Sequence, residues 1–153
     1  MITEEEVKIA QQQWGDGIVR IGKLFSEKKD YKKAAEEFVD KNYGFDERTV
    51  LFKPTKASEL PFRVTKEGAV SYFVSGNEEY PEDQGFALLP ITDVRFKNAA
   101  ISISENEAVS MGHYFFTNLE GEQLKVEYTM VFYRSKDRSV KLWLHHSSFP
   151  FIP

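Results

Sequence analysis

The spacing of the hydrophobic residues changes once along this chain, near Phe86. Before that point apolar residues recur every three, four or seven positions, which is the spacing of one face of a helix. After it they alternate with polar residues, which is the pattern of half-buried strands. Helices gathered at the front and strands at the back do not build an alternating parallel sheet. We therefore predict an α+β fold.

The first predicted helix has a defined start and a weak middle. Thr3 and Glu6 have the S/T-x-x-E form of a capping box, so the helix begins after Thr3 and extends to about Phe25. Each glycine within it weakens a helix by about 1 kcal/mol relative to alanine. We therefore predict close packing on a sheet, or a local bend, at Gly15, Gly17 and Gly22.

Three shorter elements are predicted before the strand region. Asp30 can cap a second helix, which Gly44 is expected to end in a left-handed conformation. Residues 49–52 resemble a short strand. Thr65 can cap a third helix that ends near Gly76.

The period-two region divides into four strand-like segments, separated by short polar turns. Consecutive hairpins of this kind form an antiparallel meander. The acidic stretch NEEYPEDQG, residues 77–85, is predicted to be a surface loop. The predicted strands cover residues 94–104, 108–117, 123–134 and 139–148.

Composition narrows the classes of protein. A chain of 153 residues can bury a core without disulfides, and we predict a single domain over residues 1–153. The content of 41% hydrophobic and 29% charged residues is that of a globular protein, and 14% aromatic residues favour a pocket walled by rings. The chain has no cysteine, which removes thiolate nucleophiles and thiolate metal ligands.

Charge and hydropathy limit location and partners. The net charge of -4 gives no basic face for nucleic acid. No apolar run approaches the ~20 residues of a membrane span. The first residues, MITEEEVKIA, are acidic where a signal peptide would be basic. We predict a cytoplasmic protein that binds neither nucleic acid nor a membrane.

The last predicted strand ends in two histidines and two serines, in KLWLHHSSFP. Side chains on a strand alternate between faces, so neighbouring residues of each pair point in opposite directions. If the leucine face is interior, His146 and Ser148 line a pocket, and otherwise His145 and Ser147 do. We predict the first arrangement. A regular strand places on one face Leu142, Leu144, His146 and Ser148, and on the other Trp143, His145 and Ser147.

The same alternation disfavours two kinds of chemistry. The chain has only three histidines, and the adjacent pair points apart, so a site with three histidine ligands is hard to assemble. Two histidines with Glu127 remain an alternative, although we predict no bound metal and no cofactor. Ser148 and His146 lie roughly 7 Å apart along a strand, too far for direct activation of a serine nucleophile. No G-x-S-x-G elbow is present either.

Six segments in order resemble the metal-free branch of the iota-class carbonic anhydrases: WGDGIVRIG, TVLFKPTKA, FRVTKEGAVSYFVSG, MGHYFFT, LKVEYTMVF and LHHSSFP. The ending LWLHHSSFP also resembles proteins related to the calcium/calmodulin-dependent kinase II association domain. The order of elements is similar to the cone-shaped nuclear-transport-factor-2-like (NTF2-like, cystatin-like) fold. The resemblance implies N-terminal helices packed on a curved, mainly antiparallel sheet.

What the resemblance implies for function is the reversible hydration of carbon dioxide in the cavity of the cone, without a metal. Bicarbonate would be held by a threonine, a tyrosine and a serine. These match Thr55 in FKPTK, Tyr72 in SYF, and either Ser147 or Ser148, of which strand parity favours Ser148. His146 is the available base.

Several alternatives remain open at this stage. Tyr114 or Tyr128, and not Tyr72, can be the tyrosine that the resemblance implies for bicarbonate binding. The chain can instead be a non-catalytic module for small-ligand binding or oligomerisation, as kinase association domains are. An isomerase or dehydratase would need a carboxylate deep in the cavity, for which Glu127 is the strand candidate. We also predict a homodimer.

Overall fold

Five strands form one sheet in the order β1-β5-β4-β3-β2. Strands β2 to β5 pair antiparallel with their neighbours, whereas β1 runs parallel to β5 at one edge. The predicted antiparallel meander is therefore confirmed. The computed structural model describes residues 1–153, and its strands are β1 (Leu51–Lys53), β2 (Ile91–Ile103), β3 (Glu107–Asn118), β4 (Gln123–Arg134) and β5 (Val140–Ser148).

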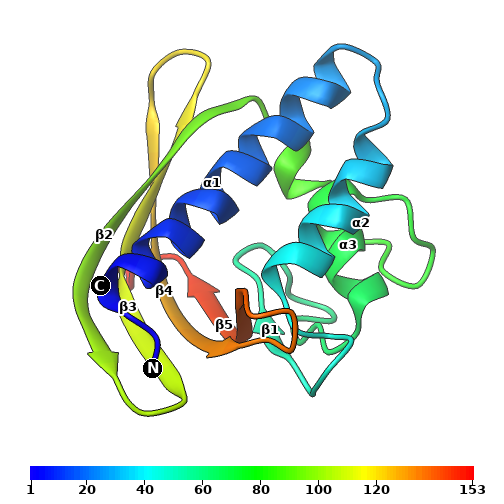
Figure 1. The fold of residues 1–153 in the computed structure, drawn as a ribbon. Helices are drawn as coiled ribbons and strands as arrows, with labels where there is room; N and C mark the ends of the chain where they lie inside the picture. Colours follow the sequence, from blue (N-terminus) through cyan, green and yellow to red (C-terminus); the bar gives the residue numbers. More distant parts are fainter.

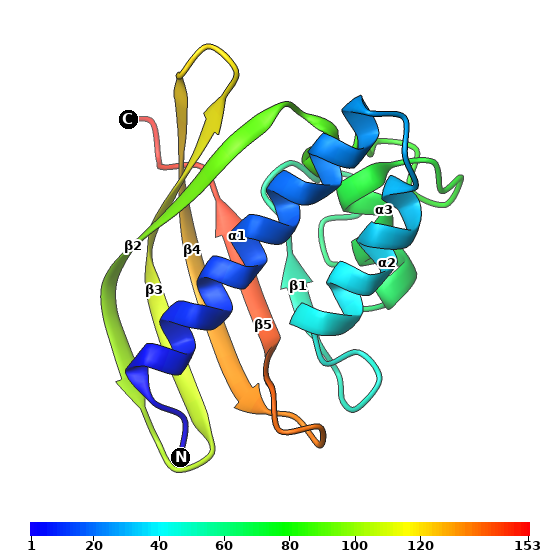
Figure 2. The ribbon, with the colours of Figure 1, turned by 45° about the horizontal axis from the view of Figure 1, so that its top comes forward.

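The helices cover one face of this curved sheet (Figure 1). Helix α1 crosses the concave face, and α2 and α3 lie beside it toward the edge formed by β1 and β5 (Figure 2). The predicted α+β class, with N-terminal helices on a curved and mainly antiparallel sheet, is confirmed. The helices are α1 (Glu4–Ser26), α2 (Tyr31–Asn42), α3 (Lys66–Val74) and the single 3-10 turn η1 (Phe86–Leu88).

Helix α1 begins at the predicted capping box, where the side chain of Thr3 accepts a hydrogen bond from the backbone of Glu6. The helix then runs without interruption through its glycines. A Cβ atom at Gly15 would lie 3.0 Å from the side chain of Val94 on β2. Gly17 and Gly22 face the Phe38 ring and the backbone of Ala87 with equally little room. Close packing, and not a bend, is therefore what the glycines provide.

Helix α2 ends differently from the prediction. Asp30 caps its start by accepting a hydrogen bond from the backbone of Lys33. The residue after the helix, Tyr43, is extended, and Gly44 is not among the glycines with a positive φ. The left-handed stop predicted at Gly44 is therefore wrong. A side chain there would instead collide with the ring and hydroxyl of Tyr133.

Strand β5 contains one extra residue, which makes a β-bulge. Val131 of β4 pairs with Leu144, and the next residue of β4, Phe132, pairs with Leu142. Trp143 is left without a partner in the ladder. The alternation of faces along β5 therefore shifts by one residue at Trp143.

The bulge overturns the predicted assignment of faces. Leu142 is buried as predicted, at 2% exposure, but so are His145 and Ser147, at 1% each. His146 is exposed, and Ser148 is half-buried on the same outer side. The prediction that His146 and Ser148 face the interior is wrong, because a regular strand was assumed and an extra residue is present.

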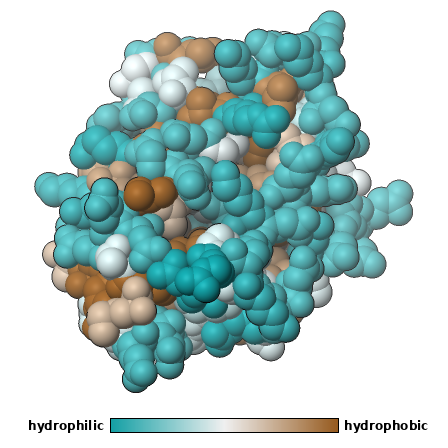
Figure 3. Space-filling model, viewed as in Figure 1, coloured by the Kyte–Doolittle hydropathy of each residue, from teal (hydrophilic) through white to brown (hydrophobic).

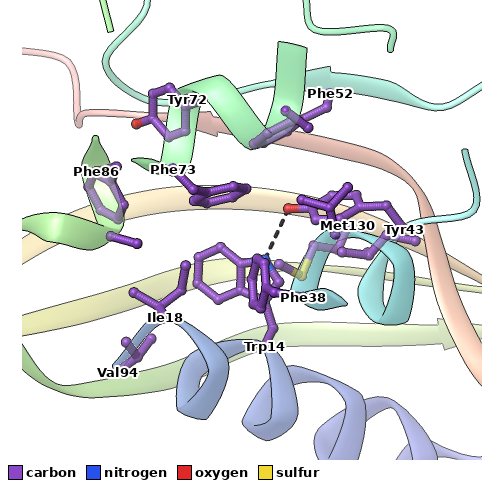
Figure 4. Packing of buried hydrophobic residues seen from close by; sticks show 14 of the residues in the cluster. Trp14, Ile18, Phe38, Tyr43, Phe52, Tyr72, Phe73, Phe86, Val94 and Met130 are labelled. Carbon is purple, nitrogen blue, oxygen red and sulfur yellow. Dashed lines mark hydrogen bonds between the residues drawn. The ribbon is translucent and has the colours of Figure 1, made fainter. Parts of the chain in front are cut away.

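The space between α1 and the sheet is filled by aromatic rings (Figure 4). Trp14 lies at their centre, 3% exposed, with six rings at centroid distances of 6.4 Å or less. Together 30 buried residues form one hydrophobic cluster. The rings around Trp14 belong to Phe38, Phe73, Phe96, Tyr114, Phe116 and His145.

The outer surface on the helical side is largely hydrophilic (Figure 3). Hydrophobic side chains gather at the lower left of this view, the region where Figure 1 places both ends of the chain. The most exposed large hydrophobic residues are indeed terminal, with Met1 at 82% and both Phe151 and Ile152 at 86%. None of the helices combines the length and apolar character that crossing a membrane requires.

Candidate active site

A small pocket lies where β1, α3, η1, β3 and β5 meet beside Trp14. Its volume is about 10 Å³, close to the ~10–15 Å³ that a single water molecule needs, so the pocket is small and tightly lined. Six lining residues are apolar, and the remaining ones are Thr55, Tyr72, Tyr114, His145 and Ser147.

Ser147 is held between two other hydroxyl groups. Its Oγ lies 2.5 Å from Thr55 Oγ1 and accepts a hydrogen bond of 2.5 Å from the hydroxyl of Tyr114. The parallel pairing of β1 and β5 explains this contact, because Lys53 is in register with His146 and Thr55 follows two residues later. The motif FKPTK thus places its threonine against the end of β5.

Tyr72 approaches the same pocket from α3, the helix that Thr65 caps. Its hydroxyl accepts a hydrogen bond of 3.1 Å from the backbone N–H of Lys56. Its ring stacks on Phe86 at a centroid distance of 5.7 Å. Burial raises the pKa of Tyr72 to about 12, so the phenol keeps its proton at neutral pH and remains a hydrogen-bond donor.

His145 is the buried histidine of the site. Its Nδ1 lies 2.8 Å from the Tyr43 hydroxyl and its Nε2 lies 3.0 Å from the Tyr114 hydroxyl. The Phe52 ring stacks on the imidazole at 5.0 Å. Burial, with a smaller contribution from neighbouring His146, lowers the pKa of His145 to about 3. The ring is therefore neutral at physiological pH.

The structure thus brings together three of the residues predicted from the sequence, Thr55, Tyr72 and Ser147. His146 and Ser148, the other two, do not line the pocket. The sequence interpretation missed the position of His145, because a bulge leaves no mark in the hydrophobic pattern. It also treated Tyr114 only as a substitute for Tyr72, whereas both tyrosines line the pocket.

Of the groups considered as metal ligands, only His145 lines the pocket, and the others lie elsewhere. Glu127 is on the outer face of the sheet, with its carboxylate 3.8 Å from His113 Nε2. No group of three His, Asp or Glu side chains is close enough to hold a metal ion. That no metal takes part in the reaction stays a prediction.

Sequence comparison shows which known proteins this chain is similar to. The sequence profile of metal-independent carbonic anhydrases matches residues 5–149, nearly the whole chain. The chain belongs to the metal-independent carbonic anhydrase family. A member of this family from Nostoc sp. (strain PCC 7120) is 40% identical over 153 residues, covering 98% of this chain and 75% of the relative. The predicted resemblance is thereby confirmed.

Solved structures agree with this assignment. The crystal structure of a cyanobacterial iota-carbonic anhydrase complexed with bicarbonate matches with a TM-score of 0.96 and 40% identity, covering 99% of this chain and 94% of the other. A calcium/calmodulin-dependent kinase II association-domain type protein from Xanthomonas campestris matches with a TM-score of 0.62 at 18% identity, covering 98% of this chain and 89% of the other. An NTF2-like family protein from Streptomyces avermitilis matches with a TM-score of 0.59 at 16% identity, covering 97% of this chain and 96% of the other. The last two confirm the predicted NTF2-like fold.

Proposed function

We propose that this protein hydrates carbon dioxide reversibly to bicarbonate in the pocket beside Trp14. One observation carries the proposal: Thr55, Tyr72 and Ser147 gather around a buried pocket in a chain of the metal-independent carbonic anhydrase family. The related cyanobacterial enzyme was crystallised with bicarbonate and shares the fold along nearly its whole length.

The residue types suit this chemistry. Carbon dioxide is small and apolar, and the aromatic lining of the pocket favours its entry. When a water oxygen attacks the carbon, a C–O bond forms while the π bond of one C=O breaks, and negative charge develops on the carboxyl oxygens. The proton of the attacking water passes to the solvent. Fixed hydroxyl donors in a buried pocket stabilise the charge on the oxygens. Because hydroxyls carry no charge, they hold the bicarbonate anion without binding it too tightly.

The same features disfavour the other candidate functions. An isomerase or dehydratase needs a carboxylic acid in its cavity, and no lining residue of this pocket carries one. A purely oligomerising module would have no use for converging buried hydroxyls.

The first prediction concerns these donors. We expect Tyr72→Phe and Ser147→Ala each to lower the hydration rate by roughly 10 to 1000 fold, the first by loss of a donor and the second by loss of the hydroxyl group that contacts Thr55. Ser148→Ala, on the outer side of the same strand, is the matched control and should keep the full rate. A stopped-flow pH-drop assay measures all of them. Full rates in both pocket variants would remove these residues from the site.

The absence of a metal from the reaction is tested on the same preparation. We expect activity to persist after treatment with a chelator, and elemental analysis to show no stoichiometric zinc or manganese. Activity that is lost on chelation and restored by one ion would contradict a metal-free mechanism.

We also propose, on the basis of the sequence, that the protein is a homodimer in the cytoplasm. Sedimentation equilibrium tests the first part, since a homodimer has twice the 17.7 kDa mass of the chain. Cell fractionation tests the second.

A further inference from the structure

A continuous chain of hydrogen bonds begins at the centre of the core and ends at the pocket. Trp14 Nε1 on α1 donates to the hydroxyl of Tyr43 at 3.0 Å, the contact drawn in Figure 4. The Tyr43 hydroxyl then lies 2.8 Å from His145 Nδ1. Trp14 is 3% exposed, and Tyr43 and His145 are each 1% exposed, so water does not compete for these groups.

The second half of the chain reaches the substrate side. His145 Nε2 lies 3.0 Å from the Tyr114 hydroxyl, which is 2.5 Å from Ser147 Oγ. Ser147 Oγ is in turn 2.5 Å from Thr55 Oγ1. The Thr55 hydroxyl also lies near the phenols of Tyr72 and Tyr114, and Thr55 lines the pocket.

The indole of Trp14 fixes the direction of the first link. An indole N–H is only a donor, so the Tyr43 oxygen is the acceptor. The hydroxyl proton of Tyr43 then has one remaining partner, His145 Nδ1. The opposite orientation would leave that proton buried without an acceptor, which is rare in folded proteins and destabilising. His145 Nδ1 therefore accepts and carries no proton.

Each later link follows from this one. A neutral imidazole without a proton on Nδ1 carries it on Nε2, so His145 donates to the Tyr114 oxygen. Tyr114 then donates to Ser147, and Ser147 donates to Thr55. The proton of the Thr55 hydroxyl is not used by this chain of hydrogen bonds, so Thr55 can donate it on the pocket side, toward a substrate or the Tyr72 oxygen. Burial, which lowers the pKa of His145 to about 3, supports the neutral ring on which this order depends.

We propose that Tyr43 and Trp14 are positioning residues, which orient this chain so that Thr55 meets the substrate as a hydrogen-bond donor. The inference rests on the proposed function, because a donor at Thr55 attracts the developing bicarbonate anion. With every link reversed, Thr55 would point oxygen lone pairs at the same anion. The Trp14 indole prevents this reversal. It is the only other neighbour of the Tyr43 hydroxyl, and its N–H cannot accept a hydrogen bond.

The test measures the tautomer of His145 together with the rate. Nitrogen-15 NMR of histidine-labelled protein should show His145 protonated on Nε2. In Tyr43→Phe the donor to Nδ1 is gone, so a population protonated on Nδ1 should appear. The value of kcat/KM for hydration should fall about tenfold, at the lower end of the range expected for outright removal of a donor. Trp14→Phe is the alternative variant if Tyr43→Phe does not fold. It keeps an aromatic ring in the core but removes the indole N–H, and we expect the same changes in tautomer and rate.

Two matched controls remove a tyrosine hydroxyl and an indole N–H that do not belong to this chain of hydrogen bonds. The Tyr133 hydroxyl and the Trp143 indole N–H have no hydrogen-bond partner, so Tyr133→Phe and Trp143→Phe should leave tautomer and rate unchanged. The inference is overturned by protonation of His145 on Nδ1 in the unaltered protein. It is also overturned if Tyr43→Phe keeps the proton on Nε2 or keeps the full rate. If the unaltered protein hydrates no carbon dioxide, the proposed function fails, while the tautomers still decide the direction of the chain.

Discussion

Arg63 is a charged side chain that is wholly enclosed, with 0% exposure. Its guanidinium forms two hydrogen bonds to the Asp83 carboxylate, at 2.8 and 2.7 Å, and donates to the backbone carbonyls of Leu60 and Gly68. Asp83 also accepts a hydrogen bond of 2.6 Å from Ser71. This pair ties the loop of residues 77–85 to α3, the helix that positions the candidate tyrosine.

The second prediction tests this pair. Asp83→Asn leaves the buried Arg63 charge with only the more distant carboxylate of Glu82, at 4.0 Å, and we expect the free energy of unfolding to fall by about 3 kcal/mol. The control is Asp40→Asn, which breaks a partly exposed pair with Lys66 at 2.8 Å. That change should reduce stability by about 0–1 kcal/mol. Urea denaturation of both variants decides the matter, and equally small losses would show that Arg63 finds another partner.

At the residue scale, the sequence predicts functional residues that belong to a short motif. It does not predict contacts between residues that are far apart along the chain. Thr55 and Tyr72 were assigned from short motifs, and both line the pocket. Asp83 was placed in a surface loop, because charged side chains are usually solvated, yet its carboxylate is 0% exposed. Its partner Arg63 is 20 residues away, and nothing in either segment indicates the pairing.

At the scale of elements, every predicted helix and strand exists, since long periodic segments are the strongest signal in a sequence. The bulge in β5 is what the sequence could not give. An extra residue is recognised only against the partner strand, where Leu142 and Leu144 pair with successive residues of β4. That one position decides whether His145 or His146 is interior.

The third prediction follows from the bulge. Deletion of Trp143 would turn β5 into a regular strand in which Leu142 and Leu144 keep their present partners. His145 and Ser147 would then still face the pocket. We therefore expect this variant to fold and to keep hydration activity, with about 1–3 kcal/mol less stability. Part of that loss is the contact of Arg48 with the Trp143 ring, 4.4 Å from its centroid.

The control for this deletion is removal of Thr129 from the middle of β4, where the pairing with both neighbouring strands is regular. That change turns part of β4 over, placing polar side chains in the core, and should prevent folding. Circular dichroism and the hydration assay on both variants test the idea. Loss of the fold in the Trp143 deletion would show that the extra residue is needed for the curvature of the sheet.

At the scale of the whole molecule, the core holds a histidine that the folded state keeps uncharged. The folded protein lowers the pKa of His145 to about 3, mainly by burial, whereas an unfolded histidine titrates near ~6.5. Between these values the unfolded chain binds a proton that the folded chain does not. Stability is therefore complete above ~6.5 and falls as the pH falls toward about 3.

The fourth prediction is the size of this effect in a window where it can be isolated. Between pH 8 and 5 we expect the free energy of unfolding to drop by about 2 kcal/mol because of His145. Carboxylates such as Glu6, whose pKa the hydrogen bond with Arg134 lowers to about 2, contribute in the same direction only below ~4.5. Urea denaturation across this window should give a clear slope in the unaltered protein and in His146→Gln. In His145→Gln the drop should shrink by about that amount, whatever the overall stability of the variant. An unchanged slope in His145→Gln would mean that the buried imidazole accepts a proton as readily in the folded protein as in the unfolded chain.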